Sequence, residues 1–200
     1  MMTLGITGRS GCGKSTVTAA LRAHGVPCVD ADQTAREVLA PGSPCLAAVL
    51  QAFGADLLRG GVLDRRALAD RAFATPEGTR RLSALTQPEI VRRVAEAREA
   101  ARRSGAWLFA VDAAVLIGSA FEKECDRVLV VTAPFAASVQ RICQRDGISP
   151  EMAARRLSAQ RSEQELCARA DYVICNDGGR EALLAQTERF YETIREELHA

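Results

Sequence analysis

A glycine-rich segment near the start of the chain has the composition of a phosphate-binding loop. It runs Gly8-Arg9-Ser10-Gly11-Cys12-Gly13-Lys14-Ser15-Thr16 and fits the pattern GxxxxGK[ST] in full. Glycines let the backbone curl so that successive N–H groups point at one place, and a following helix adds its positive dipole end. In this pattern the lysine reaches the β- and γ-phosphates, and the Ser hydroxyl joins the Mg²⁺ shell. The segment predicts binding of a nucleoside triphosphate with Mg²⁺ through Gly11, Cys12, Gly13, Lys14, Ser15 and Thr16.

The segments on either side have the order that such a loop requires. Residues 4–7 form a short apolar run typical of a buried strand, and residues 15–23 have a helical pattern that stops at His24-Gly25. Residues 26–29 predict a second strand. Strand, loop, helix and strand within thirty residues indicate a βαβ unit, which implies a parallel sheet with helices on both faces.

Apolar runs later in the chain complete this sheet. Further strands are predicted over residues 106–111, 127–131 and 172–174, and residues 34–105 have helical patterns broken by Pro and Gly with no strong strand run. We therefore predict an α/β P-loop NTPase fold with a five-stranded parallel sheet flanked by helices. Its core comprises residues 1–33 and 106–200, residues 34–105 form a helical acceptor-binding insertion, and residues 140–169 form a helical lid.

Composition excludes several classes of partner. The 200 residues are 48% apolar and 26% charged with a net charge of +1, so there is no electrostatic case for a nucleic acid or a membrane surface as partner. The most apolar stretch, residues 106–118, is shorter than the ~20 apolar residues of a membrane span, and no signal peptide is evident. Seven scattered cysteines without a CxxC pair predict free thiols in a reducing cytoplasm. We expect a cytoplasmic monomer or weak oligomer that acts on small molecules.

Other sequence features narrow the class of nucleotide-binding protein. A GTPase would need a base-reading NKxD late in the chain, and Cys175-Asn176-Asp177 is not one. A transport ATPase would need a signature motif and more length. A small chain with an early P-loop, a helical insertion and a late Arg-rich helical segment is typical of a small-molecule kinase, in which the Arg-rich segment closes over the phosphates.

Five further segments carry a family resemblance. Together with the P-loop they span nearly the whole chain: Gly25-Val26-Pro27-Cys28-Val29-Asp30-Ala31-Asp32, Leu63-Asp64-Arg65-Arg66-Ala67-Leu68, Arg145-Asp146-Gly147, Ala159-Gln160 and Ala170-Asp171-Tyr172-Val173-Ile174 with Asn176. This combination resembles the dephospho-CoA kinase family. The resemblance implies transfer of the γ-phosphoryl group of ATP to the 3′-hydroxyl of the ribose of dephospho-CoA, the last step of coenzyme A synthesis.

The resemblance also implies catalytic roles for particular residues. Asp32 follows the predicted strand 26–29 at the carboxyl edge of the sheet, where a carboxylate can accept the proton of the ribose hydroxyl; its alternative role is a helix N-cap. Lys14 and Arg141 are the other expected catalytic residues, with Arg141 as a phosphate clamp. Arg145 lies four positions beyond Arg141 on a predicted helix and shares its face, so it is expected to contact ATP unless it lies on a solvated face.

Four more residues receive expected binding roles from the resemblance. Asn176 would contact adenine or serve as a turn residue, and Asp112 would hold Mg²⁺ through water or act as a cap. Thr7 and Arg65 are expected on the acceptor side. The alternative role for Arg65 is a cation at the start of a helix.

The sequence departs from the family pattern mainly on the acceptor side. Gln87 stands where the family has His and is expected to bind the acceptor, while Ala114, Ile117 and Gly118 replace Pro, Phe and an acidic residue. These changes leave two alternatives open. One is a kinase of another nucleoside or nucleotide hydroxyl, and the other is a nucleotide-binding regulatory paralogue without transfer activity. Retention of Lys14 and Asp32 together argues against the second alternative.

Overall fold

The computed structural model describes residues 1–119 and 121–199. The chain divides into two compact units, one formed by Met1–Val29 with Ala101 onward, the other by Asp30–Ala100. The second unit corresponds to the predicted insertion but begins and ends a few residues earlier in the chain. It begins earlier because a helix starts at Ala31, directly after the second strand. Asp32, expected in the core segment, therefore belongs to the second unit.

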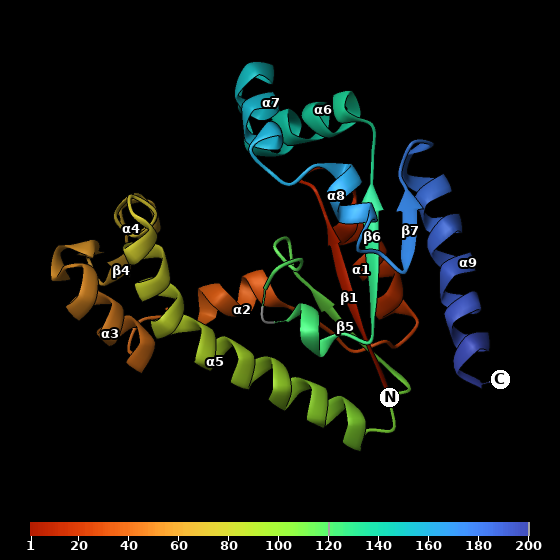
Figure 1. Ribbon diagram of the computed structural model, residues 1–200, viewed down its shortest axis with the longest axis horizontal. Coiled ribbons are helices and arrows are strands. Elements are labelled where there is room, and N and C mark those ends of the chain that lie inside the picture. The colour runs from red at the N-terminus through yellow and green to blue at the C-terminus, as the bar shows by residue number, and fades with distance from the viewer. Residues whose placement is uncertain (120, 200) are drawn as a thin grey trace. The chain divides into compact units, whose positions relative to one another are not determined.

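The first unit is built on a parallel sheet of five strands, as the sequence predicts (Figure 1). In spatial order the strands are β2 (Cys28–Asp30), β5 (Leu108–Asp112), β1 (Met2–Gly8), β6 (Arg127–Thr132) and β7 (Tyr172–Cys175). β1 pairs with β5 and β6, with Ile6 opposite Asp112 and Gly8 opposite Val131. All five residues of β5 are buried, which is typical of a parallel strand covered on both faces. The register places the end of β1 beside the end of β5.

Two long helices cover one side of this sheet. They are α1 (Lys14–Ala23) and α9 (Gly179–His199), which pack against each other and against the strands. Leu4, Ile6 and Leu129 of the strands contribute to one apolar core with Val17, Leu21, Leu183 and Ile194 of the helices. Each such fully buried side chain stabilises the fold by about 1.5–3 kcal/mol. This core fixes the position of the loop that joins β1 to α1.

The predicted lid is helical and has an apolar core of its own. It contains α6 (Phe135–Asp146), α7 (Pro150–Ser158) and α8 (Glu163–Cys167), and the arrowheads of β1 and β6 point toward this region (Figure 1). Ile142, Ala153 and Leu157 form a small buried cluster separate from the sheet core. Ser149 caps α7 by accepting from the Met152 N–H, and Pro150 follows at the first helical position, where proline is tolerated.

The second unit is largely helical but holds one hairpin that the sequence pattern did not predict. Its elements are α2 (Ala31–Glu37), α3 (Pro44–Phe53), the 3₁₀ turn η1 (Ala55–Leu57), β3 (Leu58–Arg59), β4 (Val62–Leu63), α4 (Arg65–Ala72) and α5 (Pro76–Arg103). Gly60 and Gly61 join β3 to β4 with φ of 56° and 81°, a two-residue hairpin turn that glycine favours. Strands of two residues are too short to produce a periodic pattern. The expected break at Pro88 is also wrong, because α5 continues through it.

A second 3₁₀ turn, η2 (Glu122–Glu124), lies between β5 and β6. Across the two described ranges, none of the helices combines the length and the apolar character needed to cross a bilayer.

Candidate active site

The phosphate-binding loop lies where β1 ends and α1 begins. Gly8 is the last residue of β1 and Lys14 the first residue of α1. Between them Gly11 and Gly13 have φ of 78° and 101°, in the left-handed region that favours glycine. A Cβ at Gly13 would lie 2.5 Å from Nδ2 of Asn176, so any side chain there would displace the loop. The strand–loop–helix context that the motif requires is present.

Lys14 forms an ion pair with Asp112 at the end of β5. The lysine ammonium donates to Oδ1 of Asp112, and the Thr18 hydroxyl donates to Oδ2 at 2.8 Å. The side chains of Lys14 and Asp112 are only 17% and 8% exposed. The pair keeps the lysine charge at the carboxyl edge of the sheet, and Thr18 holds the other oxygen of the carboxylate.

Cys12 and Asn176 are buried residues that contact each other at the phosphate-binding loop. Cys12 is 2% exposed, and burial raises the pKa of its thiol, so it is a small packing residue within the loop. Asn176 is 4% exposed and donates from Nδ2 to the Cys12 carbonyl at 2.8 Å. Its Oδ1 is buried with no hydrogen-bond partner among the described residues. Asn176 therefore supports the loop through its hydrogen bond to the Cys12 carbonyl, and contact between Asn176 and adenine stays a prediction.

Only one of the two expected lid arginines reaches the loop in this structure. Arg141 donates from Nη1 to the Gly11 carbonyl at 3.1 Å. Arg145 instead pairs with Asp146 at 2.7 Å, and Arg156 holds the same carboxylate at 2.6 Å. The structure thus brings Arg141 to the phosphate-binding loop, while contact between Arg145 and ATP stays a prediction.

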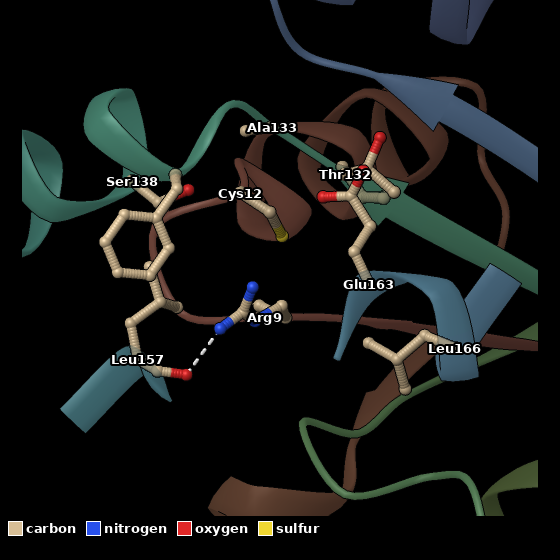
Figure 2. Close-up of a pocket in the computed structure, with 10 residues that line it drawn as sticks. Arg9, Cys12, Thr132, Ala133, Ser138, Leu157, Glu163 and Leu166 are labelled. Carbon is tan, nitrogen blue, oxygen red and sulfur yellow. Dashed lines mark hydrogen bonds between the residues drawn. The ribbon is translucent and has the colours of Figure 1, made fainter. Parts of the chain in front are cut away.

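The lid makes further contacts with the loop that sequence reasoning did not find. Oε1 of Gln160 accepts from the Ser10 N–H at 2.9 Å, and Nε2 donates to the Ser10 hydroxyl at 2.7 Å. Arg9 donates to the Leu157 carbonyl at 2.6 Å (Figure 2), and its guanidinium lies 5.8 Å from the centre of the Phe135 ring. The Ala159-Gln160 motif was a signal for this contact, but a motif alone does not show which loop its side chain meets.

Arg9 and Cys12 also face one small enclosed space. Figure 2 shows the Arg9 guanidinium and the Cys12 sulfur directed into a cavity of about 10 Å³ between the loop and the lid. A cavity of that size holds one water at most. The thiol is therefore shielded, which agrees with its raised pKa.

Thr7, which was expected on the acceptor side, is fully buried in β1, and its hydroxyl donates to the Ala114 carbonyl at 3.4 Å. The hydroxyl therefore helps to hold the loop that follows β5, and contact between Thr7 and the acceptor stays a prediction.

The residues expected to bind Mg²⁺ suit that ion chemically. Ser15 is exposed on the first turn of α1, and Asp112 offers a carboxylate at the same loop. Hydroxyl and carboxylate oxygens are the ligands that Mg²⁺ prefers, usually together with substrate phosphates and water. Among the residues that the structure describes, no cluster of three or more His, Cys, Asp or Glu could hold a metal. A magnesium ion here would therefore depend on the nucleotide for most of its ligands.

The remaining expected residues lie within the second unit. Asp30 is the N-cap of α2 and accepts from the Gln33 N–H at 2.8 Å, whereas Asp32 lies half-buried in the first turn of that helix. The cap role considered for Asp32 thus belongs to Asp30. Arg65 donates to the Arg36 carbonyl at 2.8 Å. Oε1 of Gln87 is buried with no partner in the described part of the chain.

Comparison with known proteins identifies the relatives of this chain. A profile of the family described as dephospho-CoA kinase matches residues 2–182. The chain belongs to the dephospho-CoA kinase family. A curated dephospho-CoA kinase from Anaeromyxobacter dehalogenans is 42% identical, over 98% of this chain and 93% of the relative.

Two solved structures have a fold similar to that of this chain. One is TT1252 from Thermus thermophilus, with a TM-score of 0.81, 34% identity and coverage of 98% of this chain and 97% of that chain. The other is a dephospho-CoA kinase from Campylobacter jejuni, with a TM-score of 0.61, 25% identity and coverage of 96% of each chain. The predicted family and the P-loop kinase fold are confirmed, and the chain is a member of a family of ATP-dependent kinases.

Proposed function

We propose that this chain transfers the γ-phosphoryl group of ATP to the 3′-hydroxyl of the ribose of dephospho-CoA, giving ADP and coenzyme A. The observation that carries the proposal is the family match over residues 2–182, with 42% identity to a curated dephospho-CoA kinase. The geometry of the loop supports it, because the phosphate-binding residues converge at one edge of the sheet.

The charge of the transferred group is neutralised by two side chains near the loop. Lys14 exchanges Asp112 for oxygens of the β- and γ-phosphates when ATP binds, and the loop N–H groups hold the same phosphates. Arg141, which donates to the Gly11 carbonyl without nucleotide, turns to the phosphoryl group as the lid closes. Ser15 and, through water, Asp112 would hold Mg²⁺, which would supply further neutralisation of the phosphate charge.

Asp32 is the proposed general base. The 3′-oxygen forms a bond to the γ-phosphorus as the bond from that phosphorus to the β,γ-bridging oxygen breaks, and ADP leaves. The hydroxyl proton passes to the Asp32 carboxylate. A position two residues beyond β2 supports this role, since ligands of doubly wound folds bind outside the carboxyl ends of the strands.

Residues of the second unit are proposed to bind the acceptor. Arg65 and Gln87 are the proposed contacts from the second unit. Thr7 contributes by holding the Ala114 carbonyl. Small molecules are the only partners we propose, for a cytoplasmic monomer or weak oligomer, and the seven free cysteines support a reducing compartment.

An acceptor panel tests the proposed reaction. ADP release is measured with ATP–Mg²⁺ and dephospho-CoA, adenosine, a nucleoside monophosphate or no acceptor. We expect dephospho-CoA to give the highest kcat/KM. A higher kcat/KM with adenosine or the monophosphate would assign a different acceptor, and ADP release independent of any acceptor would refute the transfer.

A pair of conservative variants tests Asp32. Asp32→Asn keeps the shape but cannot take a proton, and loss of a general base costs about 10²–10⁴-fold in rate. Asp30→Asn is the matched control, because Asn caps a helix as well as Asp does. We expect only Asp32→Asn to lose kcat. If kcat holds and only the KM of the acceptor rises, Asp32 binds the ribose without acting as a base.

A further inference from the structure

A cavity of about 310 Å³ opens beside the phosphate-binding loop, on the side that faces the segment after β5. It lies at the lower end of the size range of ligand pockets, about 300–1,000 Å³, and so has room for part of a nucleotide. Two of its lining residues are Gly8, the last residue of β1, and Arg9, which follows it. The other lining residues come from the segment after β5 and from the end of the lid.

The lining combines apolar and polar side chains. The apolar ones are Ala114, Val115, Ile117 and Leu166, and Val115 is 71% exposed. The polar ones are Arg9, Gln160 and Arg161, and the described lining residues include no carboxylate. A ligand that fits has an apolar ring and a negatively charged group.

Two of the three polar side chains already have fixed roles. Both ends of the Gln160 amide bind Ser10, and Arg9 donates to the Leu157 carbonyl while it lies over Phe135. Arg161 differs from them, because it lines the cavity and is exposed, in the segment that follows helix α7. It is the lining cation best placed to meet an anion from solution.

The loop after β5 leaves space for the Arg161 guanidinium. A Cβ at Gly118 would lie 3.0 Å from Nη2 of Arg161, so a side chain there would press on the guanidinium. Two carboxylates lie near this loop, and the pKa of one of them, Glu165, is lowered by hydrogen bonds from Ser162 and also by the charge of Arg161. Glu122 accepts from the Gly118 N–H at 2.7 Å and from Arg169 at 2.6 Å, and Glu165 accepts from the Ser162 N–H at 2.8 Å.

We propose that Arg161 is a specificity-determining residue that binds a phosphate group of the acceptor, whose ring portion occupies this cavity. The inference rests on the proposed function. A guanidinium presents paired N–H donors that match phosphate oxygens, so it selects an acceptor carrying a phosphate over one that carries only a hydroxyl.

The first test compares Arg161→Gln with Arg189→Gln, which removes an exposed arginine from α9. We measure KM for dephospho-CoA, KM for ATP and kcat, and we measure the Kd of dephospho-CoA by calorimetry without ATP. Arg161→Gln should raise both acceptor constants roughly ten- to hundredfold, as the loss of one charged hydrogen bond does. The KM for ATP and kcat should hold, and Arg189→Gln should match the wild type.

The second test uses the neighbouring glycine. Gly118→Asp and Gly118→Asn have the same shape, and both residues tolerate a positive φ better than other side chains. Only Gly118→Asp adds a charge that competes for Arg161, so its acceptor KM should exceed that of Gly118→Asn.

The possible results distinguish the role of Arg161 from the proposed transfer of phosphate to dephospho-CoA. If the wild type phosphorylates dephospho-CoA and Arg161→Gln leaves both acceptor constants unchanged, the role of Arg161 is refuted while the proposed function holds. An equal rise in the KM for ATP would refute it too, by assigning Arg161 to the nucleotide. A wild type that does not use dephospho-CoA would refute both.

Discussion

Gln160 binds Ser10 through both ends of its side-chain amide. Oε1 accepts from the Ser10 N–H at 2.9 Å, and Nε2 donates to the Ser10 hydroxyl at 2.7 Å. Gln160 lies two residues beyond the end of α7, and Ser10 lies in the first half of the phosphate-binding loop. One side chain therefore joins the predicted lid to the loop, and we expect the position of the lid and the shape of the loop to be coupled through it.

Removal of this amide should loosen the lid in the nucleotide-free protein. Gln160→Ala loses two neutral hydrogen bonds, each worth about 0.5–1.5 kcal/mol. We expect faster amide hydrogen exchange over residues 140–169 than in the wild type without nucleotide, and a higher KM for ATP. With an ATP analogue bound, Arg141 and the phosphates should restore much of the protection.

The matched control is Gln164→Ala, an exposed glutamine on α8. It should exchange as the wild type does. Equal protection of residues 140–169 in Gln160→Ala and wild type would contradict the coupling. Equal protection of the wild type with and without the analogue would contradict a closing lid.

Lys14 should be indispensable for transfer. Lys14→Ala removes the ammonium that the structure holds against Asp112 and that neutralises the phosphates in the proposed mechanism. Loss of a comparable charge clamp costs on the order of 10³-fold in rate. Steady-state kcat at saturating ATP is the measurement, and Lys123→Ala, at the only other lysine of the chain, is the control. More than a tenth of wild-type turnover in Lys14→Ala would refute its role.

The parallel sheet and the loop at its edge could be predicted from sequence because each rests on local patterns. The apolar run before Gly8, the glycine loop and the helix after it specify β1 and α1 without reference to distant residues. The same holds for the start of α7, because Ser149 followed by Pro150 is a local pattern that favours the first turn of a helix.

The contacts between distant segments could not be predicted in this way. Ser10 and Gln160 are separated by 150 positions, and no spacing rule pairs them. Thr7 was expected to face the acceptor, yet the position of the strand in the sheet buries it. The β3–β4 hairpin rests on two-residue strands, so only its Gly60-Gly61 turn could have indicated it.

Asp146 should make the stability of the lid sensitive to acid. The hydrogen bond from Arg145, assisted by Arg156, lowers the pKa of the Asp146 carboxyl below its ordinary value of about 3.9. A lowered folded-state pKa means that the contribution is present above the ordinary pKa and is lost as pH falls through the lowered one. The carboxylate joins the end of α6 to α7 through Arg156.

The measurement compares the wild type with Asp146→Asn. At pH 7 the wild type should have the larger free energy of unfolding, and the difference should shrink as pH falls below about 4. A difference that stays constant down to pH 2 would show that the charge of Asp146 is not what stabilises the lid.

Gln87 should limit the affinity for the acceptor. Its Oε1 is buried on α5 with no partner in the described residues, and a neutral amide brings no charge to a phosphate. Gln87→His supplies a donor that is positively charged when protonated, and a hydrogen bond to a charged group contributes about 1.5–3 kcal/mol. We expect a KM for dephospho-CoA roughly tenfold lower, with kcat unchanged. Because an ordinary imidazole has a pKa of about 6.5, the gain should be larger at pH 6 than at pH 8.

Gln87→Met is the control, since it removes the unpartnered oxygen without adding a donor. An equal fall in KM in Gln87→Met, or a gain in Gln87→His that does not change with pH, would assign the effect to packing of α5 and not to charge.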